Sequence, residues 1–198
     1  AEHLLERGFE RFAFCGFKKE AWSERRKHGF TQRLQDAGFE AAYYESIWQG
    51  RAALPWEAEQ RHLADWLQQQ EPPFAVMACN DGRGINVIEA CSQLSLSVPE
   101  QVAVLGVDND DLLCRVSTPP LSSVIPNAVS VGFKAAELLS QRMSGAGLDA
   151  KTQLVAPLGV ATRQSTDVVA IEAREVAAAL RVLSADAGRG VGGEEVVA

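Results

Sequence analysis

The stretch from Phe74 to Val124 decides the fold of this chain, and it reads FAVMACNDGRGINVIEACSQLSLSVPEQVAVLGVDNDDLLCRVSTPPLSSV. It contains two short apolar runs, Phe74–Ala78 and Val102–Val107, with little polar alternation. Such runs are typical of strands buried on both faces of a parallel sheet. Between them, apolar residues at three-residue spacing predict one face of a helix: Ile85, Ile88, Cys91 and Leu94. The stretch therefore predicts a strand–helix–strand unit with a right-handed crossover.

A polar cluster follows each of the two predicted strands. Asn80 and Asp81 come after the first strand, and Asp108, Asn109 and Asp110 come after the second. In open α/β sheets, ligands bind in the crevice beyond the carboxyl ends of the strands. The two clusters therefore predict a pocket for a polar ligand at this edge of the sheet.

The rest of the chain continues an α/β pattern with a parallel, Rossmann-like sheet. We expect further strands at 11–16, 41–45, 121–125, 153–156 and 159–162, and helices at 1–7, 23–37, 56–70 and about 128–143. Ser23 and Asn127 are the predicted N-caps of two of these helices. The second helix is expected to bury Phe30, Leu34 and Ala37.

Two side chains outside the central unit are candidates for ligand contact. Arg26 falls on the same helix side as Phe30 and near the helix N-terminus, where a cation opposes the helix dipole. This placement suggests a ligand or partner, although a surface arginine paired with Glu24 or solvent is the alternative. Trp48 lies in a predicted loop, where its flat apolar face suits stacking on a sugar ring, although burial in the core is the commoner fate of tryptophan.

Composition and motifs limit the class of protein. The 198 residues carry a net charge of −7, so the charge does not argue for a nucleic-acid surface on this piece itself. No apolar run approaches the ~20 residues of a membrane helix, and no signal peptide is visible. The four cysteines lack metal-ligand or paired spacing and are expected to be reduced thiols of a cytoplasmic protein. Because Ala1 is not a methionine and already reads as part of a helix, we expect a fragment cut at both ends.

No motif for catalysis stands out. The chain has no G-x-S-x-G, no H-E-x-x-H and no phosphate loop, and its three histidines sit among charged residues of predicted helices. The acidic cluster Asp108, Asp110 and Asp111 lacks the remaining spacing of a calcium loop, so we interpret it as a cap for the following turn that gives one carboxylate to the pocket. We therefore expect no enzyme activity, no cofactor and no metal site.

Three segments carry a resemblance to a known family: ACND (78–81), SVPEQVAVLGVDN (97–109) and PPLSSVIPN (119–127). They resemble the effector-binding domain of the lactose/galactose-repressor (LacI/GalR) type, which is related to periplasmic sugar-binding proteins. The resemblance covers residues 1 to about 166. Within this family the chain is similar to xylose operon regulators, in which such a sensor precedes an AraC-type helix-turn-helix domain. Residues 167–198 resemble the first helix of that domain and the start of its second.

The resemblance implies a set of sugar contacts. Arg26, in the pattern Arg-x-x-Gly-Phe, matches the arginine that reaches sugar hydroxyls. Asn80 and Asp81 match the polar pair at a strand end, and Asp108 matches the aspartate that takes two hydroxyls. Trp48 matches only loosely. The chemistry is suitable because a carboxylate accepts hydrogen bonds and a guanidinium donates several in fixed geometry.

The resemblance also implies an organisation and a function. Residues 1–166 would be a partial sugar-sensing domain, mostly its second lobe, and 167–198 the truncated start of the DNA-binding domain. The first lobe would be missing, so the helix at about 128–143 should expose its apolar face. The expected function is a cytoplasmic, homodimeric transcription regulator that binds a pentose effector, D-xylose, and reaches operator DNA through C-terminal helices beyond this chain.

Two other function classes compete with this interpretation. A periplasmic sugar-binding protein of a transporter would share the sensor fold, but it should end soon after the last strands. The segment 171–198 therefore favours the regulator. A sugar-modifying enzyme would need a base or nucleophile that the sequence does not offer.

Overall fold

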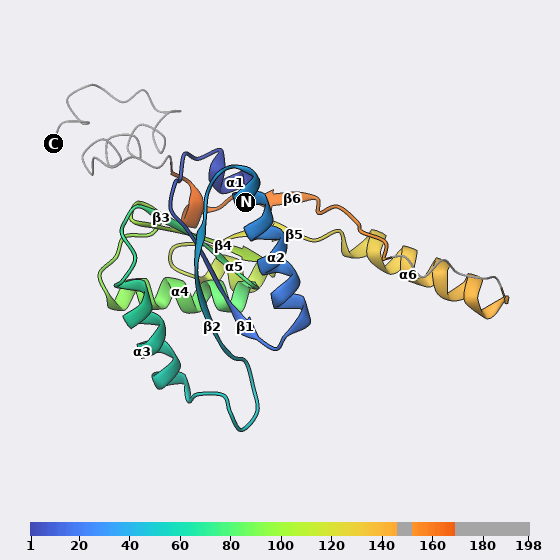
Figure 1. Ribbon diagram of the computed structural model, residues 1–198, viewed down its shortest axis with the longest axis horizontal. Coiled ribbons are helices and arrows are strands. Elements are labelled where there is room, and N and C mark those ends of the chain that lie inside the picture. The colour runs from blue at the N-terminus through green and yellow to red at the C-terminus, as the bar shows by residue number, and fades with distance from the viewer. Residues whose placement is uncertain (146–151, 169–198) are drawn as a thin grey trace.

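A computed structural model of the chain describes residues 1–145 and 152–168. Its centre is a six-stranded sheet with strand order β2-β1-β3-β4-β5-β6, in which only β6 runs antiparallel to its neighbour (Figure 1). The strands are β1 (Phe12–Lys18), β2 (Ala41–Ile47), β3 (Phe74–Ala78), β4 (Val102–Val107), β5 (Ser122–Ile125) and β6 (Gly159–Ala161). The expected α/β fold with a mostly parallel sheet is confirmed.

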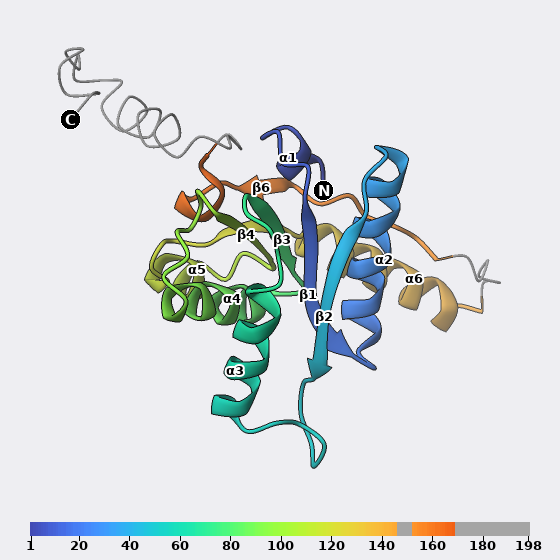
Figure 2. The same cartoon turned by 60° about the vertical axis from the view of Figure 1, so that its left-hand side comes forward.

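Helices cover both faces of this sheet, as Figure 2 shows for α2 on one side and α3 and α4 on the other. The helices are α1 (Glu2–Leu5), α2 (Ala21–Asp36), α3 (Trp56–Leu67), α4 (Asp81–Gln93), α5 (Asp111–Val116) and α6 (Ala128–Met143), followed by the short 3-10 helix η1 (Gln164–Thr166). This three-layer arrangement follows from strands that are apolar on both sides, because each face must be covered.

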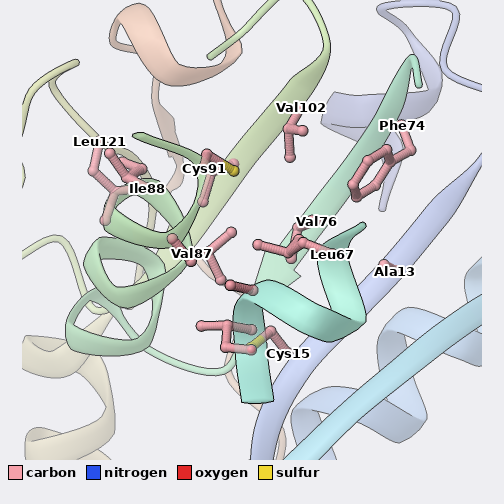
Figure 3. Packing of buried hydrophobic residues seen from close by; sticks show 14 of the residues in the cluster. Ala13, Cys15, Leu67, Phe74, Val76, Val87, Ile88, Cys91, Val102 and Leu121 are labelled. Atoms are coloured by element: carbon pink, nitrogen blue, oxygen red, sulfur yellow. The ribbon is translucent and has the colours of Figure 1, made fainter. Parts of the chain in front are cut away.

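The core is divided by the sheet into two clusters. On the face of α3 and α4, Val76 and Val102 pack against Leu67 and Val87 (Figure 3). On the opposite face, Ala75 and the other alternate strand residues pack against α1 and α2. Successive side chains of a strand point to opposite faces. β3 and β4 therefore need apolar residues at consecutive positions, because both faces of these strands are buried.

The central strand–helix–strand unit has the predicted bounds at both strands, Phe74–Ala78 and Val102–Val107. The helix at Ala128–Met143 is also confirmed, and its N-cap is Asn127, whose side chain accepts a hydrogen bond from the Ser130 N–H. All four cysteines are buried and unpaired.

Three local predictions were wrong. α2 begins at Ala21 rather than after Ser23; the Ser23 hydroxyl is instead buried and accepts the Phe17 N–H at 3.0 Å, a contact that a helix-start pattern does not reveal. Ala37 is exposed at the C-cap, because the helix ends before its side chain can turn inward. Residues 153–156 form no strand, since only Gly159–Ala161 pairs with β5.

The predicted exposure of the helix at 128–143 is confirmed. α6 buries none of its residues and projects away from the sheet (Figure 1). Val129, Phe133, Leu139 and Met143 are each at least 60% exposed. Residues 169–198, which hold nearly all of the expected start of a DNA-binding domain, lie outside the described residues.

A chain of hydrogen bonds ties the N-terminus to η1. His3 Nε2 lies 2.8 Å from Thr166 Oγ1, which donates to Ser122 Oγ at 2.7 Å. His3 Nδ1 lies 3.1 Å from a guanidinium nitrogen of Arg7, and because a guanidinium only donates, Nδ1 must accept. The imidazole is thus held neutral, and burial, reinforced by Arg7, lowers the pKa of His3 to about 4.

This arrangement predicts a pH-dependent loss of stability. The folded pKa of His3 lies below the ordinary value of 6.5, so the unfolded chain binds the proton more readily, and stability should fall as the pH drops from about 6.5 towards 4. After solvent screening we expect roughly 1–3 kcal/mol from this residue. The measurement is urea unfolding across this pH range. His3→Gln should make the free energy of unfolding depend less on pH than it does in the exposed control His62→Gln. Equal pH slopes in the two variants would contradict the lowered pKa of His3.

Candidate functional site

An arginine–aspartate pair lies where the strands of the sheet end. Arg26, on the second turn of α2, donates from Nη2 to Asp108 Oδ1 at 2.6 Å and from Nη1 to Oδ2 at 3.3 Å. Nη1 also donates to the Cys79 carbonyl at 2.6 Å. The side chains are 28% and 46% exposed, so both can be reached by a ligand. The structure therefore brings together two predicted site residues 82 positions apart, and the alternative pairing of Arg26 with Glu24 is not present.

The backbone that carries Asp108 is strained and firmly held. Asp108 has φ 109° and Asn109 has φ 52°, a region that L-residues seldom occupy. Three consecutive amides anchor the turn: Asp108 N–H donates to the Val124 carbonyl, Asn109 N–H to Ser123 Oγ, and Asp110 N–H to a carboxylate oxygen. Strain of this kind persists only where surrounding contacts over-determine it, and it is common at binding sites.

That carboxylate belongs to Asp81, which lies behind the site. Asp81 is only 2% exposed. Its Oδ1 accepts a hydrogen bond from Ser123 Oγ at 2.5 Å, and its Oδ2 accepts one from the Asp110 N–H at 2.7 Å. Burial raises the pKa of the Asp81 carboxyl, while these two hydrogen bonds act in the opposite direction. Asp81 thus joins α4, β5 and the turn after β4.

The neighbouring Asn80 is the N-cap of α4. Its Oδ1 accepts the Arg83 N–H at 2.8 Å, which satisfies one of the free amides of the first helical turn. Within the described part of the chain, its Nδ2 makes no hydrogen bond. Asn80 therefore has a donor to offer to a ligand.

Aromatic rings stand beside the pair. Trp48 stacks on Phe17 with centroids 5.9 Å apart and meets Trp22 edge-on at 5.7 Å. The Arg26 guanidinium lies over Trp22, 5.4 Å from its centroid. Trp48 is 47% exposed, so the alternative that it is a core residue does not hold. Sequence reasoning missed Trp22 because the predicted helix began at Ser23, whereas α2 begins at Ala21 and places Trp22 four residues before Arg26 on the same helix.

A cavity of about 360 Å³ adjoins these rings, at the ends of β1 and β2 and the starts of α3 and α4. Trp48 and Asn80 line it, and so do Trp56 and Asn86. Sequence reasoning missed the cavity, because its walls come from four elements.

The floor of this cavity holds a buried ion pair that sequence reasoning also missed. Arg83, 1% exposed, donates to Glu59 at 2.7 Å and to Ser46 Oγ at 2.7 Å. Its guanidinium lies 4.5 Å from the centroid of Phe17 and 5.2 Å from that of Tyr44. An arginine between two glycines near a helix start reads as a surface residue, so only the tertiary contacts identify its role.

One member of the acidic cluster caps a helix. Asp110 is the N-cap of α5 and accepts the Leu113 N–H at 3.0 Å, as predicted. Asp111 points outward and pairs with Arg115 at 2.6 Å. Within residues 1–145 and 152–168, no three His, Cys, Asp or Glu side chains gather in a way that could hold a metal ion. No helix of these residues is long and apolar enough to cross a bilayer.

Comparison with known proteins identifies the family. The model of the periplasmic binding protein-like domain matches residues 1–166. This chain belongs to that family. The family resemblance inferred from its sequence is thereby confirmed.

Two sets of relatives refine the comparison. The xylose operon regulatory protein of Escherichia coli K12 is 32% identical over 198 residues, which cover 98% of this chain and 50% of the relative. The xylose operon regulatory protein of Haemophilus influenzae is 31% identical over 168 residues, which cover 83% of this chain and 43% of the relative. The chain therefore spans about half the length of the curated relatives it matches. A solved structure of the xylose-binding transcription activator xylR superposes with a TM-score of 0.78 at 31% identity, covering 99% of this chain and 52% of that one.

More distant structures agree on the fold. A dimeric lac repressor superposes with a TM-score of 0.66 at 20% identity, covering 83% of this chain and 58% of that one. The Escherichia coli and Haemophilus influenzae relatives are named as operon regulators and the xylR structure as a transcription activator, so none of these three is named as a transporter component.

The packing of Asp81 against β4 predicts that Gly106 tolerates no side chain. A Cβ there would overlap Asp81 Oδ1 and lie 3.3 Å from the Asp81 Cα, whereas a Cβ at Gly29 in α2 would meet nothing within 4 Å. We expect Gly106→Ala to lower the free energy of unfolding by about 1–3 kcal/mol. Gly29→Ala should leave it unchanged or raise it by up to about 1 kcal/mol, because alanine favours helix. Urea unfolding compares the two, and equal stabilities would show that the Asp81 wall is not rigid.

Proposed function

We propose that this chain is most of the second lobe of the sugar-sensing domain in a transcription regulator, and that the effector is a pentose, D-xylose. Residues 1–166 form the sensor part, and 167–198 begin an AraC-type DNA-binding domain. The observation that carries the proposal is the exposed, two-pronged Arg26–Asp108 pair beside aromatic rings at the strand ends. The names of the relatives at 31–32% identity support the choice of sugar.

The pair suits a polyol for a chemical reason. A sugar hydroxyl both donates and accepts, so it donates to a free lone pair of Asp108 and accepts from Arg26. The two charges are held facing each other, which limits the reorganisation needed on binding. Asn80 adds a free amide donor, and the exposed face of Trp48 can cover the C–H face of the sugar ring.

Asp81 has a different role in this proposal from the one first expected. Both of its oxygens accept hydrogen bonds within the lobe, and its residue is nearly fully buried. We assign it to holding the Asp108 turn, so that its effect on the sugar is exerted through Asp108.

Signalling follows from the two-lobed family. The sugar bridges this lobe and a first lobe outside this chain, and it stabilises the closed form. The apolar face of α6, which is uncovered in this lobe, is the surface that the first lobe covers. In the cytoplasm, closure in a homodimer changes how paired DNA-binding domains meet operator half-sites.

The first test measures sugar binding. Isothermal titration calorimetry on the full-length protein should detect D-xylose in preference to glucose, ribose and arabinose. Asp108→Asn should weaken xylose binding about 10–100-fold, because it removes charge-assisted hydrogen bonds of roughly 1.5–3 kcal/mol. The control Asp111→Asn removes a neighbouring exposed carboxylate that lies outside the site and should have no effect.

Three results would count against the proposal. If Asp108→Asn binds xylose normally, the site has been assigned to the wrong residues. If none of the four sugars binds, the effector class is wrong. If the protein binds operator DNA identically with and without the bound sugar, the switching mechanism fails.

A further inference from the structure

The cavity at the ends of β1 and β2 shares two residues with the proposed sugar site. Trp48 and Asn80 line the cavity and also belong to the proposed sugar contacts. Asn80 directly follows Cys79, whose carbonyl accepts a hydrogen bond from Arg26 at 2.6 Å. The proposed sugar contacts and the cavity therefore meet at Trp48 and Asn80.

The cavity is large enough to hold a ligand larger than one pentose ring. Its volume of about 360 Å³ lies within the ~300–1,000 Å³ range of pockets that enclose drug-sized ligands, which are larger than one pentose ring. Three of its wall residues keep apolar surface open to solvent: Trp48, Leu54 and Trp56 are 47%, 42% and 51% exposed. Exposed tryptophan faces are suited to the C–H faces of sugar rings.

The polar groups of the cavity match hydroxyls. Asn86 lies on α4 six residues after Asn80, and within the described residues its carboxamide makes no hydrogen bond. The Nδ2 of Asn80 is likewise free. A carboxamide can donate and accept at once, as a sugar hydroxyl does, so each can pair with a hydroxyl in either direction.

The charge of the cavity excludes anionic ligands. Its cation, Arg83, is nearly fully buried, and its guanidinium is neutralised by Glu59 at 2.7 Å and bound by Ser46 Oγ. A phosphorylated or acidic sugar would need a free cation in exchange for its hydration. The ligand that fits is neutral.

From these observations we infer that the site takes a neutral oligosaccharide of at least two units. One ring is held by Arg26 and Asp108, and the second occupies the cavity between Trp56 and Asn86. The inference rests on the proposed sugar-sensing function and extends its ligand from a single pentose to a xylose-containing disaccharide.

The test compares two sugars on the full-length protein. Isothermal titration calorimetry with D-xylose and with xylobiose should show xylobiose binding at least about 10-fold more tightly, since a second ring adds stacking and hydrogen bonds. Trp56→Ala and Asn86→Ala should each remove most of that advantage and leave the D-xylose affinity within about twofold. Gln93→Ala, an exposed residue later on α4, is the matched control and should change neither affinity.

The outcomes separate this inference from the proposed function. If D-xylose binds and depends on Asp108 but xylobiose binds no more tightly, the second subsite is wrong and the sugar sensor stands. If Trp56→Ala and Asn86→Ala weaken both sugars equally, the cavity is not a separate subsite and the inference is overturned. If neither sugar binds, both proposals are overturned.

Discussion

A buried carboxylate holds together the segments that form the site. Asp81 sits at the start of α4, and its two oxygens accept from a serine of β5 and from the backbone of the turn after β4. Burying a charge is unfavourable unless it is well hydrogen-bonded, and here burial raises the pKa of the Asp81 carboxyl. The two hydrogen bonds to Asp81 offset the free-energy cost of burying its charge. Because losing them would leave the carboxylate buried and unpaired, they hold α4, β5 and the turn after β4 together.

The shape of the site follows from this constraint. Because Gly106 has no side chain, α4 can approach β4 closely enough for Asp81 to reach β5. With the turn anchored at three amides, Asp108 holds a strained backbone and directs its carboxylate to Arg26. A second pair, Arg83 with Glu59, does the same for the cavity by fixing its floor without leaving a net charge there. The two ion pairs thus differ in their surroundings, since one is accessible and the other is buried.

Much of this could be predicted from local pattern. The unbroken apolar runs of β3 and β4 indicated a sheet covered on both faces, and the polar residues after them predicted a ligand site at the strand ends. Arg26 was identified because a cation near a helix N-terminus needs a partner, and that partner is Asp108. Ser23 was misassigned because a serine near a helix start resembles a cap, while its actual partner, Phe17, lies across the strand–helix connection.

The sequence by itself determined the fold class and the strand ends, and it predicted Arg26, Asn80 and Asp108 as ligand contacts, because periodicity and strand-end polarity are local properties of the chain. Only the tertiary structure decided that Asp81 is buried with both oxygens hydrogen-bonded, that Arg83 is buried and paired, and that Trp56 and Asn86 line one cavity. These facts depend on which distant segments meet, and no local pattern encodes a contact between β2, α3 and α4. The burial of a charged group becomes visible only when its neighbours are in place.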